Sequence, residues 1–175
     1  MKTLQLGVSD LHITPLGLGA WAIGGGGYAF GWGAQNDDDS MRAIHRAVDS
    51  GINWIDTAPG YGRGRSEKVV GKAVGQMRPG SRPMIFTKCG FVWDETDPGS
   101  DGRRSLRPES IRKECENSLR RLRVEQIDLY QFHEPDEEGT PVEDSWAMMK
   151  DLAREGKIRA GGVSNFGIPL LERCE

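Results

Sequence analysis

The sequence predicts an α/β fold, a (β/α)8 TIM barrel, with about five parallel strands in this chain after an N-terminal β-hairpin. Short, almost uniformly apolar segments alternate with longer segments of helical spacing, which is typical of a parallel sheet covered by helices. A doubly wound open sheet would show the same alternation. In a barrel, however, chemically useful side chains at successive strand ends meet at one mouth. The expected strands end in Trp21, Asp56, Lys88, His133 and Ser164-Asn165, which favours the barrel.

The N-terminal segment is expected to form a hairpin and then the first strand of the sheet. Residues 1–14 alternate loosely around a turn at Gly7, and an apolar strand follows at residues 15–20. The pattern Gly17-x-Gly19-x-x-Ala22 has the spacing of a dinucleotide-binding fingerprint, but that motif must open directly into a helix. Here a glycine run and an aromatic loop follow instead. The segment is therefore interpreted as a loop.

A helix and a short strand are expected between residues 37 and 56. Asp37-Asp38-Asp39-Ser40 supplies N-cap candidates and favourable negative charge for the helix start, and Gly51 closes the helix. A short buried strand then ends in the carboxylate of Asp56. Glycines on both sides of Tyr61 let the following turn fold tightly and hold the phenol ring in one place.

The next expected units are a helix, a strand and a long connection. The helix begins at Ser66 and stops at Pro79, and the strand at residues 84–88 ends in Lys88. Residues 91–106 are polar and contain glycine, with no periodicity, so they are expected to form a loop. Loops of that length are usually functional or mobile.

Two further helix–strand units follow. Pro108 lies near the first turn of a helix, and the strand after it ends in His133. Residues 140–143 have capping-box spacing, with proline at the first helical position of the next helix. The buried stripe expected on that helix is Val142, Trp146, Met149, Leu152 and Ala153. A strand at residues 158–163 and a helix opening near Pro169 complete the pattern.

Composition narrows the class of protein. The 175 residues are enough for one core, so a single domain over 1–175 is expected. A net charge of −3 gives no indication of a nucleic-acid or membrane surface. There is no apolar signal segment and no run long enough to span a membrane. Three scattered cysteines make no metal site and fit a reducing compartment, so a cytoplasmic protein is expected.

Four side chains at neighbouring strand ends would make a coherent proton-transfer site: Asp56, Tyr61, Lys88 and His133. A free phenol has a pKa of about 10 and donates poorly near neutral pH. An ammonium group beside the phenol stabilises the phenolate and makes the phenol a stronger acid. The carboxylate would hold the lysine in place and keep it charged. A histidine opposite could orient a carbonyl oxygen or relay a proton.

These residues lie in motifs that resemble the aldo-keto reductase family. The matching segments span nearly the whole chain in the right order: Gly17–Trp21, Ile55–Gly62, Thr87-Lys88, Ile127–His133 and Gly162–Phe166. Trp32-Gly33 and the segment Gly64–Glu67 are most similar to the bacterial branch that includes general-stress and inositol-cluster reductases.

The resemblance implies a TIM barrel and NADPH-dependent reduction of an aldehyde or ketone. It implies that Tyr61 is the general acid, that Lys88 and Asp56 tune it, and that His133 orients the small carbonyl substrate. Ser164 and Asn165 would hydrogen-bond the nicotinamide carboxamide, and Trp21 would lie near the ring. The cofactor would supply the hydride, and the protein would supply position and charge.

The sequence departs from the family pattern in two places. Glu134 follows His133 where this branch often has tryptophan, and its carboxylate is expected to alter substrate preference or raise the pKa of His133. The chain also resembles only the first five of eight strand–helix units. An unclosed sheet would leave two strand edges unpaired and expose the interior side chains Ile55, Phe86 and Leu129 to water. Self-association through those edges is therefore expected.

Two other functions stay open from the sequence: a non-catalytic, nicotinamide-binding regulatory subunit and an inactive fragment of a reductase. Residues outside the motifs have ordinary interpretations. His45 is expected to be a surface or hydrogen-bonded histidine, and His12 belongs to the hairpin. Cys89 either has a depressed pKa beside Lys88 or, the favoured interpretation, is a small buried apolar residue.

Overall fold

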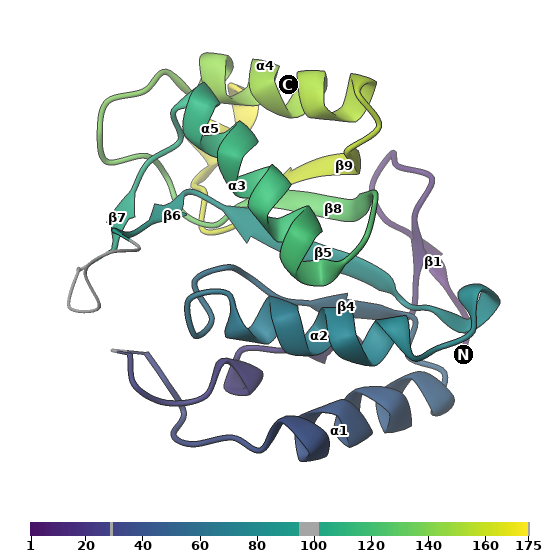
Figure 1. Ribbon diagram of the computed structural model, residues 1–175. Coiled ribbons are helices and arrows are strands. Elements are labelled where there is room, and N and C mark those ends of the chain that lie inside the picture. The colour runs from purple at the N-terminus through teal and green to yellow at the C-terminus, as the bar shows by residue number, and fades with distance from the viewer. Residues whose placement is uncertain (29, 95–101, 175) are drawn as a thin grey trace.

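The computed structural model describes residues 1–28, 30–94 and 102–174, which form a five-stranded parallel sheet with helices packed against it (Figure 1). The strands lie in chain order: β3 (Leu18–Gly19), β4 (Trp54–Asp56), β5 (Met84–Cys89), β8 (Ile127–Phe132) and β9 (Ile158–Val163). Every neighbouring pair is parallel. This is the strand–helix alternation predicted from the sequence.

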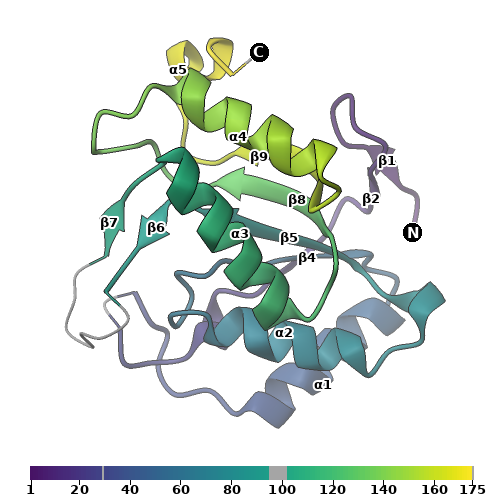
Figure 2. The same cartoon turned by 45° about the horizontal axis from the view of Figure 1, so that its top comes forward.

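The longer helices cover one face of this sheet, as Figures 1 and 2 show. They are α1 (Asp37–Asp49), α2 (Arg65–Gly75), α3 (Pro108–Leu122) and α4 (Val142–Arg154), and the short α5 (Ile168–Glu172) follows β9. The described residues also form two short 3₁₀ turns, η1 (Ala22–Gly24) and η2 (Pro79–Ser81). The apolar stripes of the helices and the outward side chains of the strands form one buried core, which includes Ile44, Val70, Ile111 and Leu152.

The opposite face of the sheet carries the side chains that a barrel would enclose. Trp54 and Phe86 stack there with ring centroids 5.1 Å apart, and Phe86 is only 3% exposed. Ile55 is fully buried among the helices instead, because successive strand residues point to opposite faces and Asp56 points inward. The expectation that Ile55 and Phe86 meet water is therefore wrong, whereas Leu129 is partly exposed.

Two small antiparallel pairs flank the sheet at opposite ends (Figure 2). β1 (Leu4–Gln5) pairs with β2 (His12–Ile13), which confirms the N-terminal hairpin. β6 (Phe91–Val92) pairs with β7 (Arg103–Arg104). The expectation of an irregular loop over residues 91–106 is thus wrong at both ends of that segment, and its middle, residues 95–101, lies outside the described residues. β6 follows β5 after the single residue Gly90, so the chain that leaves β5 goes directly into the antiparallel pair of β6 and β7.

Several element boundaries differ from expectation. The first sheet strand is only two residues long and partly exposed. The chain before it is held in a turn instead, because Thr14 donates its hydroxyl to the carbonyl of Leu16 and its backbone N–H to the side chain of Asn53. The N-cap of α1 is Asn36, whose side chain accepts hydrogen bonds from Asp38 and Asp39.

Helix α4 also starts differently. No capping box forms: Pro141 is the N-cap and not the first helical residue, and no side-chain cap bond is made. Ala153 is exposed and is not part of the buried stripe. The buried face of α4 includes Ser145 instead. Its side chain is fully buried, and its hydroxyl donates to the carbonyl of Leu106 at 2.7 Å.

Candidate active site

The carboxyl ends of β4 and β5 bring a lysine and a carboxylate together. Asp56 ends β4 and Lys88 lies near the end of β5, and the Lys88 Nζ donates to Asp56 Oδ2 at 2.6 Å. The same Nζ donates to the carbonyl of Thr57 at 2.9 Å. The Lys88 side chain is only 6% exposed, whereas that of Asp56 is 27% exposed. A cation so deeply buried needs these partners, because desolvating an unpaired charge is costly.

The phenol of Tyr61 completes this group. Lys88 Nζ lies 3.2 Å from the Tyr61 hydroxyl and 5.0 Å from the ring centroid. The turn that holds Tyr61 depends on Gly62, which has a φ of +68° and lies against the backbone of Gly24. A Cβ at Gly62 would lie 2.1 Å from the Gly24 carbonyl oxygen, so only glycine fits. Asp56, Tyr61 and Lys88 therefore lie within hydrogen-bond distance of one another through Lys88 Nζ, as expected from the sequence.

His133 faces the same phenol from the end of β8. Its ring meets that of Tyr61 edge to face, with centroids 5.7 Å apart, and its backbone N–H donates to the carbonyl of Cys89 at 2.9 Å. Burial, with the nearby charges of Lys88 and Arg104, lowers the pKa of His133 to about 4. The imidazole is therefore neutral near pH 7 and can act as a hydrogen-bond donor or acceptor.

Glu134 does not have the expected effect on His133. Its carboxylate oxygen Oε1 accepts from Asn165 Nδ2 at 3.0 Å, so it is engaged by the next strand end. The pKa of His133 is lowered and not raised, because burial and the positive charges of Lys88 and Arg104 all disfavour the imidazolium.

The remaining predicted residues border the same site. Trp21 stacks on Tyr61 with centroids 6.1 Å apart, and its Nε1 donates to the carbonyl of Phe30 at 3.0 Å. Asn165 Nδ2 donates to the carbonyl of His133 at 2.9 Å and to Ser164 Oγ at 3.1 Å. The structure thus brings all seven predicted site residues to one end of the sheet.

Sequence reasoning missed Gln131. This residue pairs in register with Lys88, and its Nε2 lies 3.4 Å from Asp56 Oδ1, so it supports the carboxylate from the next strand. The signal was present, since Gln131 lies two residues before His133 and therefore on the same face of the strand. A polar side chain on the same strand face as a predicted site residue indicates a role in the site.

Two other expectations are settled by burial and bonding. Cys89 is fully buried, and burial raises its pKa well above the usual value, so the interpretation as a buried apolar residue is confirmed. His45 is hydrogen-bonded through Nε2 to the carbonyl of Ala73 at 3.0 Å, as expected of a structural histidine.

A partly buried carboxylate on α3 supports the strand end that carries Lys88. Glu114 on α3 accepts from the backbone N–H of Gly90 at 3.0 Å and from the hydroxyl of Ser110 at 3.1 Å. Gly90 follows the strand that carries Lys88, so Glu114 anchors the turn from β5 into β6. Burial raises the pKa of Glu114 from 4.5 to about 7 despite these hydrogen bonds.

This carboxyl makes the stability of the fold depend on pH. The pKa of Glu114 is higher in the folded than in the unfolded protein. The protonated carboxyl therefore contributes fully to the free energy of unfolding below pH 4.5, and this contribution is lost as pH rises through about 7. Glu114→Gln keeps the shape without the ionisation. Relative to wild type, its free energy of unfolding should therefore rise by roughly 3 kcal/mol between pH 5 and pH 8. Urea titrations of both proteins at the two pH values measure this.

The matched control is Glu109→Gln, an exposed glutamate in the first turn of the same helix. It should show no such change between the two pH values. A stability difference between wild type and Glu114→Gln that is constant from pH 5 to pH 8 would contradict the burial of an ionisable Glu114.

Comparisons with known proteins agree from sequence and from structure. The family model described as Aldo/keto reductase family matches residues 15–175. Aldo-keto reductase YhdN of Bacillus subtilis (strain 168) is 39% identical, over 98% of this chain and 49% of that protein. NADH-specific methylglyoxal reductase of Escherichia coli (strain K12) is 40% identical, over 94% of this chain and 52% of that protein.

Solved structures give the same result. The glycerol dehydrogenase AKR11B4 from Gluconobacter oxydans matches with a TM-score of 0.86 at 43% identity, over 99% of this chain and 51% of that chain. An aldo-keto reductase from Bacillus halodurans in its holo form matches with a TM-score of 0.83 at 30% identity. The barrel prediction is thereby confirmed, and the chain spans about half the length of these relatives.

Proposed function

The chain belongs to the aldo/keto reductase family, and from that premise we propose that its site reduces the carbonyl of an aldehyde or ketone to an alcohol. The observation that carries the proposal is the position of one buried ammonium group, Lys88 Nζ, in hydrogen-bond contact with both the Asp56 carboxylate and the Tyr61 hydroxyl. This arrangement suits a phenol that gives its proton to a developing alkoxide.

Each residue then has a separate task. Tyr61 is the general acid, and Lys88 stabilises the phenolate that remains after proton transfer. Asp56, supported by Gln131, holds the lysine in position. His133, which is neutral near pH 7, hydrogen-bonds the carbonyl oxygen of the small substrate and orients it toward Tyr61.

The proposal includes a nicotinamide cofactor, NADPH, which supplies the hydride when bound. The residues present fit such a ring. The hydrogen bonds of the Asn165 amide to described residues all run from Nδ2, which leaves its Oδ1 as an acceptor for the carboxamide N–H groups. Ser164 would contact the same carboxamide, and Trp21 would border the ring. The methylglyoxal reductase of Escherichia coli is named NADH-specific, so the preference for NADPH needs a direct test.

Asn165→Ala should weaken nicotinamide binding through loss of one or two hydrogen bonds, each worth about 0.5–1.5 kcal/mol. Quenching of Trp21 fluorescence, titrated with NADPH and with NADH, reports the two dissociation constants. Gln126→Ala is the matched control, because it removes an exposed amide that donates to the carbonyl of Gly156, away from the site. Equal affinity of wild type and Asn165→Ala for both cofactors would refute the assignment of Asn165.

The activity itself is tested with a fusion in which the chain is followed by the C-terminal half of the Bacillus subtilis relative. We expect the fusion to consume NADPH in the presence of a simple aldehyde. A fusion that binds the cofactor but turns over no carbonyl would support a non-catalytic, nicotinamide-binding subunit instead. Loss of both properties would indicate an inactive fragment.

We also propose a cytoplasmic protein that self-associates. Within the described residues, no helix is long and apolar enough to cross a membrane. β3 and β9 are the outermost strands of the sheet, and unpaired strand edges are templates for pairing with another copy. Sedimentation of the purified chain should show dimers or larger species. A monomer with one sharp thermal transition would rule out pairing at these edges.

A further inference from the structure

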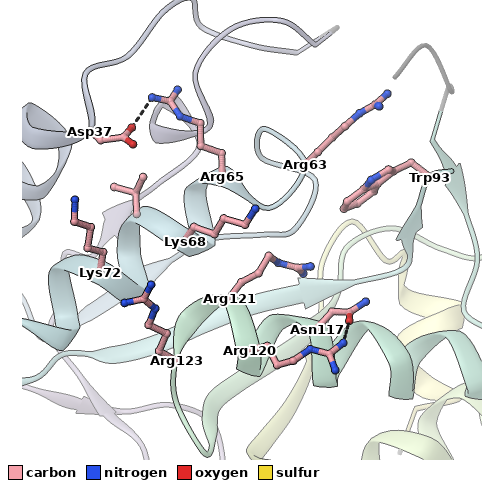
Figure 3. Close-up of a pocket in the computed structure, with 11 residues that line it drawn as sticks. Asp37, Arg63, Arg65, Lys68, Lys72, Trp93, Asn117, Arg120, Arg121 and Arg123 are labelled. Carbon is pink, nitrogen blue, oxygen red and sulfur yellow. Dashed lines mark hydrogen bonds and ion pairs between the residues drawn. The ribbon is translucent and has the colours of Figure 1, made fainter. Parts of the chain in front are cut away.

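A cavity of about 820 Å³ lies on the outer side of the sheet between α2 and α3 (Figure 3). None of the seven predicted active-site residues lines it. Its size is within the range of small-molecule pockets, roughly 300–1,000 Å³. The two helices pack closely against each other, since a Cβ on Gly71 would lie 2.5 Å from the carbonyl oxygen of Leu122. The cavity is thus a built feature of the α2–α3 packing.

The lining of this cavity is strongly cationic. Helix α2 contributes Arg65, Lys68 and Lys72, and the end of α3 contributes Arg120, Arg121 and Arg123. With Arg63, seven of the 23 lysines and arginines of the chain line one cavity, against one of its 26 aspartates and glutamates. In a chain with a net charge of −3, this is a local separation of charge.

Only part of this charge is neutralised by the protein. Arg65 pairs with Asp37 at 2.5 Å. Arg121 pairs at 2.5 Å with Glu67, which is fully buried and also accepts from Thr87 at 2.7 Å. These two ion pairs hold the side chains of Arg65 and Arg121 in place along the lining of the cavity.

Three other cationic side chains in the lining differ from Arg65 and Arg121 in their partners. Among the residues that the structure describes, Lys68, Lys72 and Arg123 form no ion pair. Exposed arginines elsewhere commonly do, as in the two-pronged contacts of Arg112 with Glu155 and of Arg173 with Glu143.

Helix stability explains many of these cations but not all of them. Cations at the end of α3 are favoured by the helix dipole, so Arg120, Arg121 and Arg123 have a structural reason to be there. At the start of α2 the dipole favours acidic residues, yet Arg65 and Lys68 lie there. Arg65, however, is paired with Asp37, and Lys72 lies in the last turn of α2, where the dipole favours a cation. Lys68 is therefore the cation of this helix that neither the dipole nor an ion pair to a described residue explains.

The spacing of the charges indicates the shape of the ligand. Arg65, Lys68 and Lys72 follow one face of α2, and the first and last are roughly 10 Å apart along the helix. A single small anion would meet only one end of this row. We propose that the cavity between α2 and α3 binds a small ligand that carries two or more phosphate groups in a chain. Figure 3 shows Trp93 at the same rim as Arg63, where a ring attached to the phosphates could lie against the indole.

The test is titration calorimetry of the full chain at low ionic strength with tripolyphosphate and with ATP, without divalent cations. Binding of tripolyphosphate supports the proposal and identifies the phosphate chain as the recognised part; tighter binding of ATP adds a contribution from its ring. We expect Lys68→Gln/Lys72→Gln to weaken both affinities at least tenfold. Both side chains are exposed, so the fold should be unaffected.

The matched control is Lys2→Gln/Lys150→Gln, which removes the same net charge from two exposed lysines outside the cavity. It should bind both ligands like wild type. Equal losses in the two double variants would reduce the effect to net charge and overturn the proposal. So would the absence of binding at millimolar concentration. Tighter binding of a single-stranded oligonucleotide than of either small ligand would assign the surface to nucleic acid instead.

Discussion

Tyr61→Phe is expected to lower the rate of carbonyl reduction by the fusion protein roughly a hundred- to ten-thousand-fold, because it removes only the proton donor. The Lys88–Asp56 pair, the strand ends and the cofactor residues stay in place, since within the described part of the chain the lost hydroxyl accepts a hydrogen bond from Lys88 alone. Cofactor affinity and thermal stability should therefore change little. Single-turnover measurements with saturating NADPH separate the chemical step from binding.

Tyr28→Phe provides the matched control for this variant. Its hydroxyl is buried and lies close to the Gly24 backbone beside Tyr61. Removing it makes the same chemical change in the same part of the chain. The rate of the control should stay near that of wild type. If Tyr61→Phe also kept the wild-type rate, the role of Tyr61 as general acid would be wrong.

Lys88→Met is expected to damage both activity and stability. The rate should fall on the order of a hundred- to a thousand-fold, because a preorganised charge next to the proton donor is lost. Stability should fall by about 3–5 kcal/mol, since the change leaves the Asp56 carboxylate largely buried without its cation. Whole domains are stable by only about 5–15 kcal/mol, so denaturant titration will register this loss clearly.

The double variant Lys88→Met/Asp56→Asn separates these two effects. Neutralising Asp56 removes the unpaired charge, so the double variant should regain at least half of the lost stability. It should not regain activity, because the phenol still lacks its ammonium neighbour. A double variant no more stable than Lys88→Met alone would show that the stability loss comes from packing, and a normal rate would remove Lys88 from the chemistry.

The strand ends were predictable because their signal is local. Each strand is a short apolar run, and the residue that ends it can be read directly from the chain, as with Asp56, Lys88 and His133. Parallel strands in one sheet place their carboxyl ends at the same edge, so the proximity of these residues follows from the fold class. The turn at Tyr61 was predictable for the same reason, since glycine on either side marks a tight bend.

The start of α4 and the pairing of β6 with β7 could not be predicted from local sequence patterns. The prediction of a capping box at the start of α4 was wrong, because Pro141 is the N-cap. The chain before it is held by the carboxylate of Asp136, which accepts hydrogen bonds from the N–H groups of Glu138 and Thr140. The β6–β7 ribbon depends on pairing between residues on either side of residues 95–101, which no periodicity announces. In both places, contacts between neighbouring segments outweighed the sequence pattern.

The sequence by itself determined the alternation of strands and helices, the family and the identity of the side chains at the strand ends, because these depend on spacing along the chain. Only the tertiary structure decided that His133 is buried enough to stay neutral, that Gln131 supports Asp56, and that Ile55 faces the helices. It alone also gathered the cations of α2 and α3 around one cavity. Burial, charge balance and contacts across dozens of residues are set when the helices pack on the sheet, and no local pattern encodes them.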